Sequence, residues 1–107
     1  DFTEAINIRP SSYFLNWRAY LKIQIDDMKG AIDDNTKAIE LEPTNTKNFF
    51  DRAYAKFQIG DLYGTISDYE QIIEIGTLEE SLTAINYLTA TYISKGIYQW
   101  VEMYFID

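Results

Sequence analysis

Residues 52–69 read RAYAKFQIGDLYGTISDY, and residues 18–34, which lie 34 positions earlier, read RAYLKIQIDDMKGAIDD. When residues 12–45 are aligned with residues 46–79, 12 of the 34 pairs are identical. Unrelated segments of this length would share about two residues, so the period is a property of the chain. A fixed period of a few tens of residues is typical of proteins built from stacked structural repeats.

Each unit of 34 residues is expected to form a helix, a tight turn and a second helix. In the second half of the first unit, residues 28–41, apolar residues keep the three- and four-residue spacing of one helix face. Between the halves, Gly60 is suited to the left-handed conformation that ends a helix, and Asp27 and Asp61 can cap the helix that follows. Pro43 follows the second apolar run and predicts its end.

These residues resemble the tetratricopeptide repeat family, whose 34-residue unit carries small, aromatic and proline positions at fixed offsets. Ala19 and Ala53 match the small residue of its first helix, and Ala31 matches that of its second helix. Thr65 and Ile72 depart from the alanines expected in the second unit. The resemblance covers nearly the whole chain and implies an all-α fold, a right-handed α-solenoid of antiparallel helix pairs.

The repeat boundaries divide residues 1–107 into one array. Residues 12–45 and 46–79 are the two full repeats, and residues 1–10 align with the second helix of a truncated preceding repeat. Residues 82–107 form a partial third repeat, which we expect to follow a longer loop at Gly76 and to break into two helices at Gly96. Because the array starts with half a unit, we expect the chain to be a segment of a longer protein.

The family resemblance implies a function, which is to hold a peptide or protein segment on the concave face formed by the first helices. Aromatic side chains with polar tips suit that role, since they bury area and still form hydrogen bonds. The alternative is that some of them only pack between helices. The same faces also carry Tyr13 and Lys47. The candidate groove residues are Asn16, Trp17, Tyr20, Phe50, Asp51, Tyr54, Gln58, Asn86 and Tyr87.

A second hypothesis is that the array is a structural spacer or a self-association module. The C-terminal segment is rich in large apolar residues, unlike the polar end expected of a capped array. Its candidate contact residues are Trp100, Tyr104 and Phe105, and the partner would be another copy of the chain. The same segment could instead be buried against its own repeat.

Two pairs of charged residues recur with the period. Arg18 corresponds to Arg52, and Asp34 corresponds to Asp68. We expect each arginine to pair with the aspartate of its own unit as a structural link between helices rather than as a ligand contact.

The charge balance limits the partner. Nine Lys and Arg against 17 Asp and Glu give a net charge of −8. Nucleic acids and anionic membrane surfaces require basic residues, so a neutral or basic protein or peptide is the expected partner. The acidic surplus also argues against the single-stranded RNA binding of related helical repeats. No apolar run predicts membrane insertion, and the compartment stays open, with the cytoplasm as default.

The sequence contains none of the residue patterns that are typical of catalytic or metal-binding sites. The chain has no Cys and no His, which removes the usual thiolate nucleophile, general base and zinc ligands. The acidic run DDMKGAIDD at residues 26–34 lacks the spacing of a calcium loop. We therefore expect no enzyme activity, no cofactor and no metal site.

Overall fold

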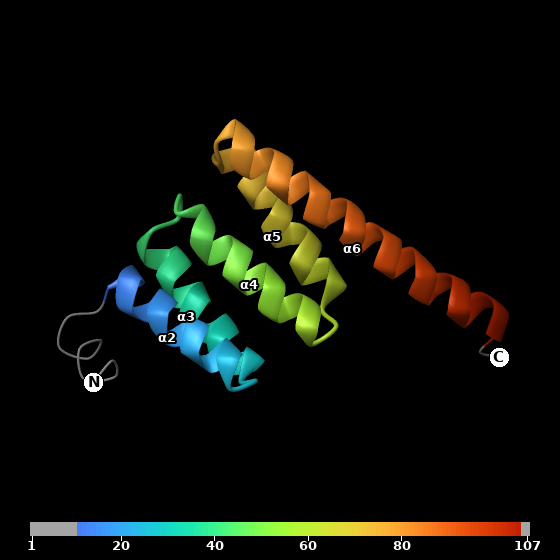
Figure 1. The fold of residues 1–107 in the computed structure, drawn as a ribbon, viewed down its shortest axis with the longest axis horizontal. Coiled ribbons are helices and arrows are strands. Elements are labelled where there is room, and N and C mark those ends of the chain that lie inside the picture. Colours follow the sequence, from blue (N-terminus) through green and yellow to red (C-terminus); the bar gives the residue numbers. More distant parts are fainter. Residues whose placement is uncertain (1–10, 106–107) are drawn as a thin grey trace.

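The computed structural model describes residues 11–105, and their side chains except those of residues 98 and 100–105 (Figure 1). Its helices are α2 (Ser12–Gln24), α3 (Met28–Leu41), α4 (Thr46–Gln58), α5 (Leu62–Ile75) and α6 (Leu78–Phe105). The described residues contain no strand, which confirms the all-α prediction. The helix expected in residues 1–10 lies outside the described part of the chain.

Successive helices run antiparallel and lie side by side in a row (Figure 1). Each helix packs chiefly against its neighbours in the sequence, while the alternate pairs α2–α4 and α4–α6 meet over a smaller contact. The molecule is correspondingly elongated, with extents of 54 × 32 × 18 Å. Because contacts join near neighbours, each unit relies on the next to cover its apolar face.

The turn inside each repeat has the same backbone structure in both units. The amide of Asp61 donates to the carbonyl of Lys56 (2.9 Å), and that of Gly60 donates to the carbonyl of Phe57 (3.0 Å). Gly60 has φ of 83°, and its counterpart Asp26 has φ of 65°. This is the left-handed helix ending that the sequence predicts, with an aspartate tolerated where glycine is easier to place.

The second helix of each unit begins at the predicted aspartate. The side chain of Asp27 accepts a hydrogen bond from the amide of Gly30 at 3.0 Å, and that of Asp61 accepts one from the amide of Gly64 at 2.9 Å. Each carboxylate satisfies an amide that the first turn of a helix would otherwise leave unpaired.

The third unit begins earlier than the sequence pattern suggests. Only Gly76 and Thr77 separate α5 from α6, so the prediction of a longer loop there is wrong. The hydroxyl of Thr77 accepts from the amide of Glu80 (3.2 Å), and the carboxylate of Glu80 accepts from the amide of Thr77 (2.9 Å). This reciprocal capping box starts the helix at Leu78 rather than near Leu82.

The prediction of a helix break at Gly96 is also wrong, because α6 is one helix of 28 residues. A glycine inside a helix costs only about 1 kcal/mol relative to alanine, so it does not end a helix by itself. At Gly60 the next residue, Asp61, caps a new helix, whereas Ile97 follows Gly96 and has no side-chain acceptor for that purpose.

Small residues allow the helices of the first unit to approach closely. Ala19, Ala31 and Ala55 are fully buried where α2, α3 and α4 meet. A larger cluster joins α4, α5 and α6 and holds α6 against the second repeat. Its buried members are Phe49, Ala53, Tyr69, Ile72 and Ala84.

The predicted arginine–aspartate pairs are confirmed in both repeats. Arg18 donates two hydrogen bonds of 2.7 Å to the carboxylate of Asp34, and Arg52 donates bonds of 3.0 and 2.6 Å to Asp68. Both aspartates are only 1% exposed. Arg52 also donates to the hydroxyl of Thr36 (3.2 Å), so it links α4 to the preceding unit as well as to α5.

A lysine completes the ion pair in the first repeat. Lys22 lies 3.0 Å from the carboxylate of Asp34. Burial by itself would raise the pKa of Asp34, but the hydrogen bonds from Arg18 and Lys22 outweigh it and hold that pKa below its ordinary value. The aspartate is therefore ionised inside the helix pair and stabilised there by two cations.

Candidate functional site

A hollow of about 590 Å³ lies beside α2, between that helix and the start of α4. Three of the predicted groove residues, Asn16, Trp17 and Tyr20, line it. The remaining lining residues come from the start of α2, from the connection between α3 and α4, and from the first turn of α4. They are Ser12, Tyr13, Glu42, Asn45 and Lys47.

The aromatic wall of the hollow is fixed by contacts within α2. The indole nitrogen of Trp17 donates to the hydroxyl of Tyr13 at 2.9 Å. The rings of Trp17 and Tyr20 meet edge to face, with centroids 5.7 Å apart. Both rings remain substantially exposed, at 41% and 45%. They present an ordered apolar surface to whatever enters the hollow.

Asn16 has a different role from the one that the sequence suggests. Its amide nitrogen donates to Asn48 (2.9 Å), to Asp51 (2.9 Å) and to Asn35 (3.3 Å). Asn35 and Asn48 are fully buried, and their own amide nitrogens have no hydrogen-bond partner among the described residues. Asn16 is thus the central donor of a polar network that joins α2, α3 and α4.

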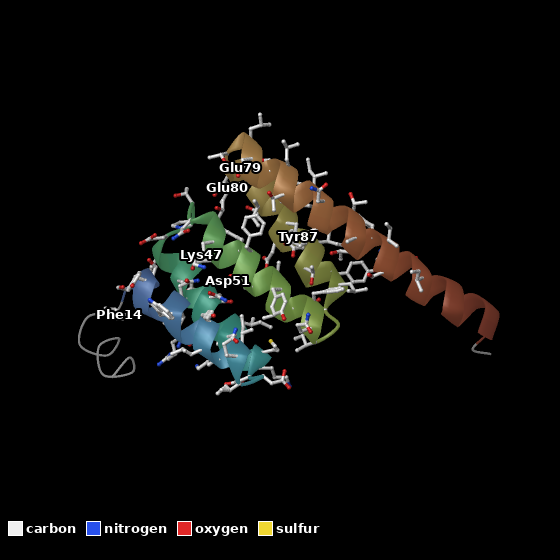
Figure 2. The ribbon with its side chains drawn as sticks, viewed as in Figure 1. Phe14, Lys47, Asp51, Glu79, Glu80 and Tyr87 are labelled. Carbon is white, nitrogen blue, oxygen red and sulfur yellow. The ribbon has the colours of Figure 1, made fainter. Side chains whose placement is uncertain are left out.

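The charged residues at the start of α4 face α2. Lys47 and Asp51 project from α4 toward that helix (Figure 2), and their charged groups are 3.5 Å apart. Asp51 therefore accepts from both Lys47 and Asn16. The predicted groove residue Asp51 lies beside the hollow as part of its supporting network rather than in its lining.

Phe50 and Tyr87 belong to an aromatic cluster where α4, α5 and α6 meet. Phe50 packs against Tyr69 and Tyr87 with ring centroids 6.2 and 6.5 Å away, and Tyr69 stacks on Tyr87 at 5.6 Å. Burial, with the nearby Tyr87 and Asp68, raises the pKa of Tyr69 to about 12. Half of Tyr87 remains exposed, so the cluster reaches the surface at one edge.

The other predicted groove residues are exposed but do not line the hollow. Tyr54 and Asn86 lie on the surfaces of α4 and α6. Gln58 instead borders a smaller depression of about 390 Å³ at the turn ends, together with Asp26 and Lys29. The structure therefore brings together the candidates of the first repeat and leaves those of the other repeats spread along the row.

The self-association candidates Trp100, Tyr104 and Phe105 lie in the last turns of α6. Their side chains are outside the described part of the structure.

Residues that the sequence did not single out complete the hollow. The hydroxyl of Ser12 donates to the carboxylate of Glu42, and Asn45 donates to the same carboxylate at 3.2 Å. These hydrogen bonds lower the pKa of Glu42. Ser12 and Thr46 correspond in the repeat, and Thr46 donates likewise to Glu80, but a hydroxyl at the start of a helix gives no signal for a groove.

No protein-family model, no curated protein and no solved structure matches the chain. Among the side chains that the structure describes, no three acidic groups lie close enough together to hold a metal ion. No helix in residues 11–105 is long and apolar enough to cross a membrane.

Proposed function

We propose that the chain is a segment of a tetratricopeptide-like right-handed solenoid that binds a peptide or an extended segment of another protein. The observation that carries this proposal is the hollow beside α2, where half-exposed aromatic rings and hydrogen-bonding groups converge. Two internal repeats with the same turns, caps and ion pairs support the assignment to a repeat array.

The aromatic wall supplies the main part of the binding energy. Trp17 is held by Tyr13 and packs against Tyr20, so its ring is already ordered before a ligand arrives. An ordered aromatic surface loses little conformational entropy on binding, which is why such residues dominate peptide interfaces. A ligand side chain buried against these two rings would anchor the peptide.

Polar groups around the hollow orient the peptide. The sequence suggests that Asn16 holds the ligand backbone, but its amide is engaged by three acceptors of the protein. We assign that role to the Tyr13 hydroxyl and to Asn45 and Lys47, which line the opening. Glu42 lies at the same rim, so a ligand with a basic residue next to its apolar anchor fits best.

Affinity of the order of micromolar is expected, since the hollow accommodates a few side chains rather than a whole domain surface. The net charge of −8 further predicts that added salt weakens the binding of basic peptides more than that of neutral ones.

The test is a selection of peptides from a random display library against the full chain, followed by a fluorescence titration. The chain has two tryptophans, so the Trp100→Phe variant leaves Trp17 as the only indole reporter. Binding in the hollow is expected to shift the emission of Trp17. The Tyr20→Ala substitution is expected to raise the dissociation constant of the peptide about tenfold, because one aromatic contact is lost.

Tyr63→Ala is the matched control, because Tyr63 is 70% exposed on α5 and does not line the hollow. It should leave the affinity unchanged. The proposal fails if no peptide is enriched over the blank surface, or if Tyr20→Ala and Tyr63→Ala bind the selected peptides equally well.

A further inference from the structure

The end of the row carries an apolar stripe on α6 that the rest of the described chain leaves uncovered. Its residues are Leu78, Leu82, Ile85, Thr89, Tyr92 and Gly96, all of them exposed. They follow one another at alternating intervals of four and three residues, the heptad spacing by which two long helices pair. We call this set the α6 stripe.

The face that holds α6 to the molecule lies about 100° around the helix from the stripe, since its residues directly precede those of the stripe in the sequence. Ser81 donates to a carbonyl of α5 at 3.2 Å, Ala84 and Leu88 pack into the core, and Lys95 lies over the ring of Tyr63 at 4.4 Å. α6 thus forms the edge of the row, and side chains project from its outer side, away from α5 (Figures 1 and 2). The α6 stripe lies between this outer side and the packed face, and all of its residues are exposed.

Comparison of α6 with α2 and α4, the first helices of the two full repeats, shows what covers the corresponding helix face in those repeats. Ala19 is the eighth residue of α2, Ala53 the eighth of α4 and Ile85 the eighth of α6. The two alanines are fully buried against the second helix of their own units, whereas Ile85 is 43% exposed. The face of α6 that bears Ile85 is therefore the face on which a helix packs in the other units.

We propose that the helix that covers the α6 stripe is α6 of a second copy of the chain, paired antiparallel about a two-fold axis near residue 87. The length of α6 favours this occupant. At 28 residues α6 is about 42 Å long, twice the length of α5, and it continues beyond the end of α5 (Figure 1). The stripe extends about 27 Å, from Leu78 to Gly96, so a helix as short as α5 would leave part of it uncovered, whereas a second α6 covers all of it.

The stripe is complementary to itself in this register. An antiparallel pair with its axis at residue 87 places Leu82 opposite Tyr92 of the second copy and Ile85 opposite its Thr89. The same register places Leu78 opposite Gly96 of the second copy. Nothing lies within 4 Å of the position that a Cβ atom of Gly96 would occupy. A glycine inside a helix weakens it, and here it provides room for an apposed leucine.

Charge also favours this face. Residues 81–94 contain no Asp, Glu, Lys or Arg, although the whole chain has a net charge of −8. Two copies repel each other least where they meet through an uncharged segment, and charged residues are depleted in the centres of protein interfaces. The pairing uses an edge of the row remote from the hollow beside α2, so it does not depend on the proposed peptide binding.

The first test is the mass of the full chain in solution, measured by light scattering over a hundredfold range of concentration. The mass is expected to rise from 12.5 kDa toward twice that value. Leu82→Lys should hold it at the monomer mass, because a lysine in the stripe would be buried in the pair. Leu41→Lys is the matched control, since Leu41 on α3 is 52% exposed and Leu82 is 54% exposed. A monomer at every concentration, or loss of association in both variants, would overturn the proposal.

The second test establishes the register and uses the absence of native cysteine. The Leu82→Cys and Tyr92→Cys variants are oxidised separately and as a mixture. The antiparallel register predicts a disulfide-linked dimer in the mixture and little in either variant alone, because two copies of residue 82 would lie about 15 Å apart along the axis. Equal cross-linking of each variant alone would indicate a parallel pair and contradict the proposal.

Discussion

Arg52 donates two hydrogen bonds to the carboxylate of Asp68, whose side chain is almost completely buried between α4 and α5. The parallel geometry of the two bonds is the strong form of an arginine–carboxylate contact. A buried carboxylate is costly unless such partners compensate it, so the pair constrains how the two helices of the unit are placed. Arg18 and Asp34 form the same contact one repeat earlier.

Removal of Arg52 should therefore destabilise the chain strongly. We expect Arg52→Ala to lower the free energy of unfolding by about 3 kcal/mol, because it leaves the charge of Asp68 buried with only Lys56 at 3.5 Å. Urea denaturation followed by circular dichroism measures the change. The double variant Arg52→Ala with Asp68→Ala should recover part of the loss, since no unpaired charge then remains. An unchanged midpoint for Arg52→Ala would contradict a structural role for the pair.

The first repeat provides a pH-dependent test of the same arrangement. The pKa of Asp34 is lower in the folded chain than its ordinary value, so folding is favoured while this carboxylate is ionised. This contribution is present above about pH 4, the ordinary pKa range of aspartate, and it is lost as the pH falls through the lower folded pKa.

We expect Asp34→Asn to be less stable than the natural chain near neutral pH, and the difference to shrink in acid. Urea midpoints of both proteins at about pH 7 and about pH 3 measure it. Asp33→Asn is a suitable control, because Asp33 is the exposed neighbour on the same helix. If the difference between Asp34→Asn and the natural chain is the same at both pH values, the ion pair does not contribute as described.

The repeat explains why so much of the fold could be predicted from the sequence. Arg18, Asp34, Gly60 and Asp61 each perform one local task, and each recurs with the period or stands at a turn whose requirements are known. Local tasks of this kind depend on residue type and spacing alone. The helices of the two full repeats, their caps and their ion pairs could therefore be predicted from the sequence.

The period carries no information where the units differ. Asn16 corresponds to Phe50, and Asn35 corresponds to Tyr69, so the same site between helices is a polar network in one unit and an aromatic cluster in the next. Which side chains meet at such a site depends on how the helices pack in three dimensions, and the 34-residue period does not record this. The sequence therefore suggests that Asn16 contacts the ligand, and it does not predict the hydrogen bonds of Asn16 to Asn35 and Asn48, which exist only when α2, α3 and α4 are packed together.

The unbroken α6 has a similar cause. The prediction of a helix break at Gly96 rests on its similarity to Gly60. Gly60 is followed by Asp61, which caps the next helix, whereas Gly96 is followed by Ile97, which cannot cap one. A helix continues through an isolated glycine unless another structure offers its backbone better hydrogen bonds.

The network around Asn16 leads to a prediction about stability rather than binding. Asn16→Ala removes the donor shared by Asn48, Asp51 and Asn35, and we expect it to lower the free energy of unfolding by about 1–3 kcal/mol. Asn86→Ala, at an exposed position on α6, should change it by less than about 0.5 kcal/mol. Thermal melts of the two variants are compared. Equal stability would mean that the amide of Asn16 is available to a ligand after all.

The two turns offer a matched pair of glycine and aspartate exchanges. Asp26 and Gly60 occupy the same left-handed position, with φ of 65° and 83°. A side chain is strained in this conformation, whereas glycine is not, although an added glycine also increases the entropy of the unfolded chain. We expect Asp26→Gly to raise the free energy of unfolding by about 0.5 kcal/mol and Gly60→Asp to lower it by about 1 kcal/mol. Urea midpoints of the two variants measure both changes, and a loss of stability in Asp26→Gly would show that the Asp26 side chain stabilises its turn by more than the strain costs.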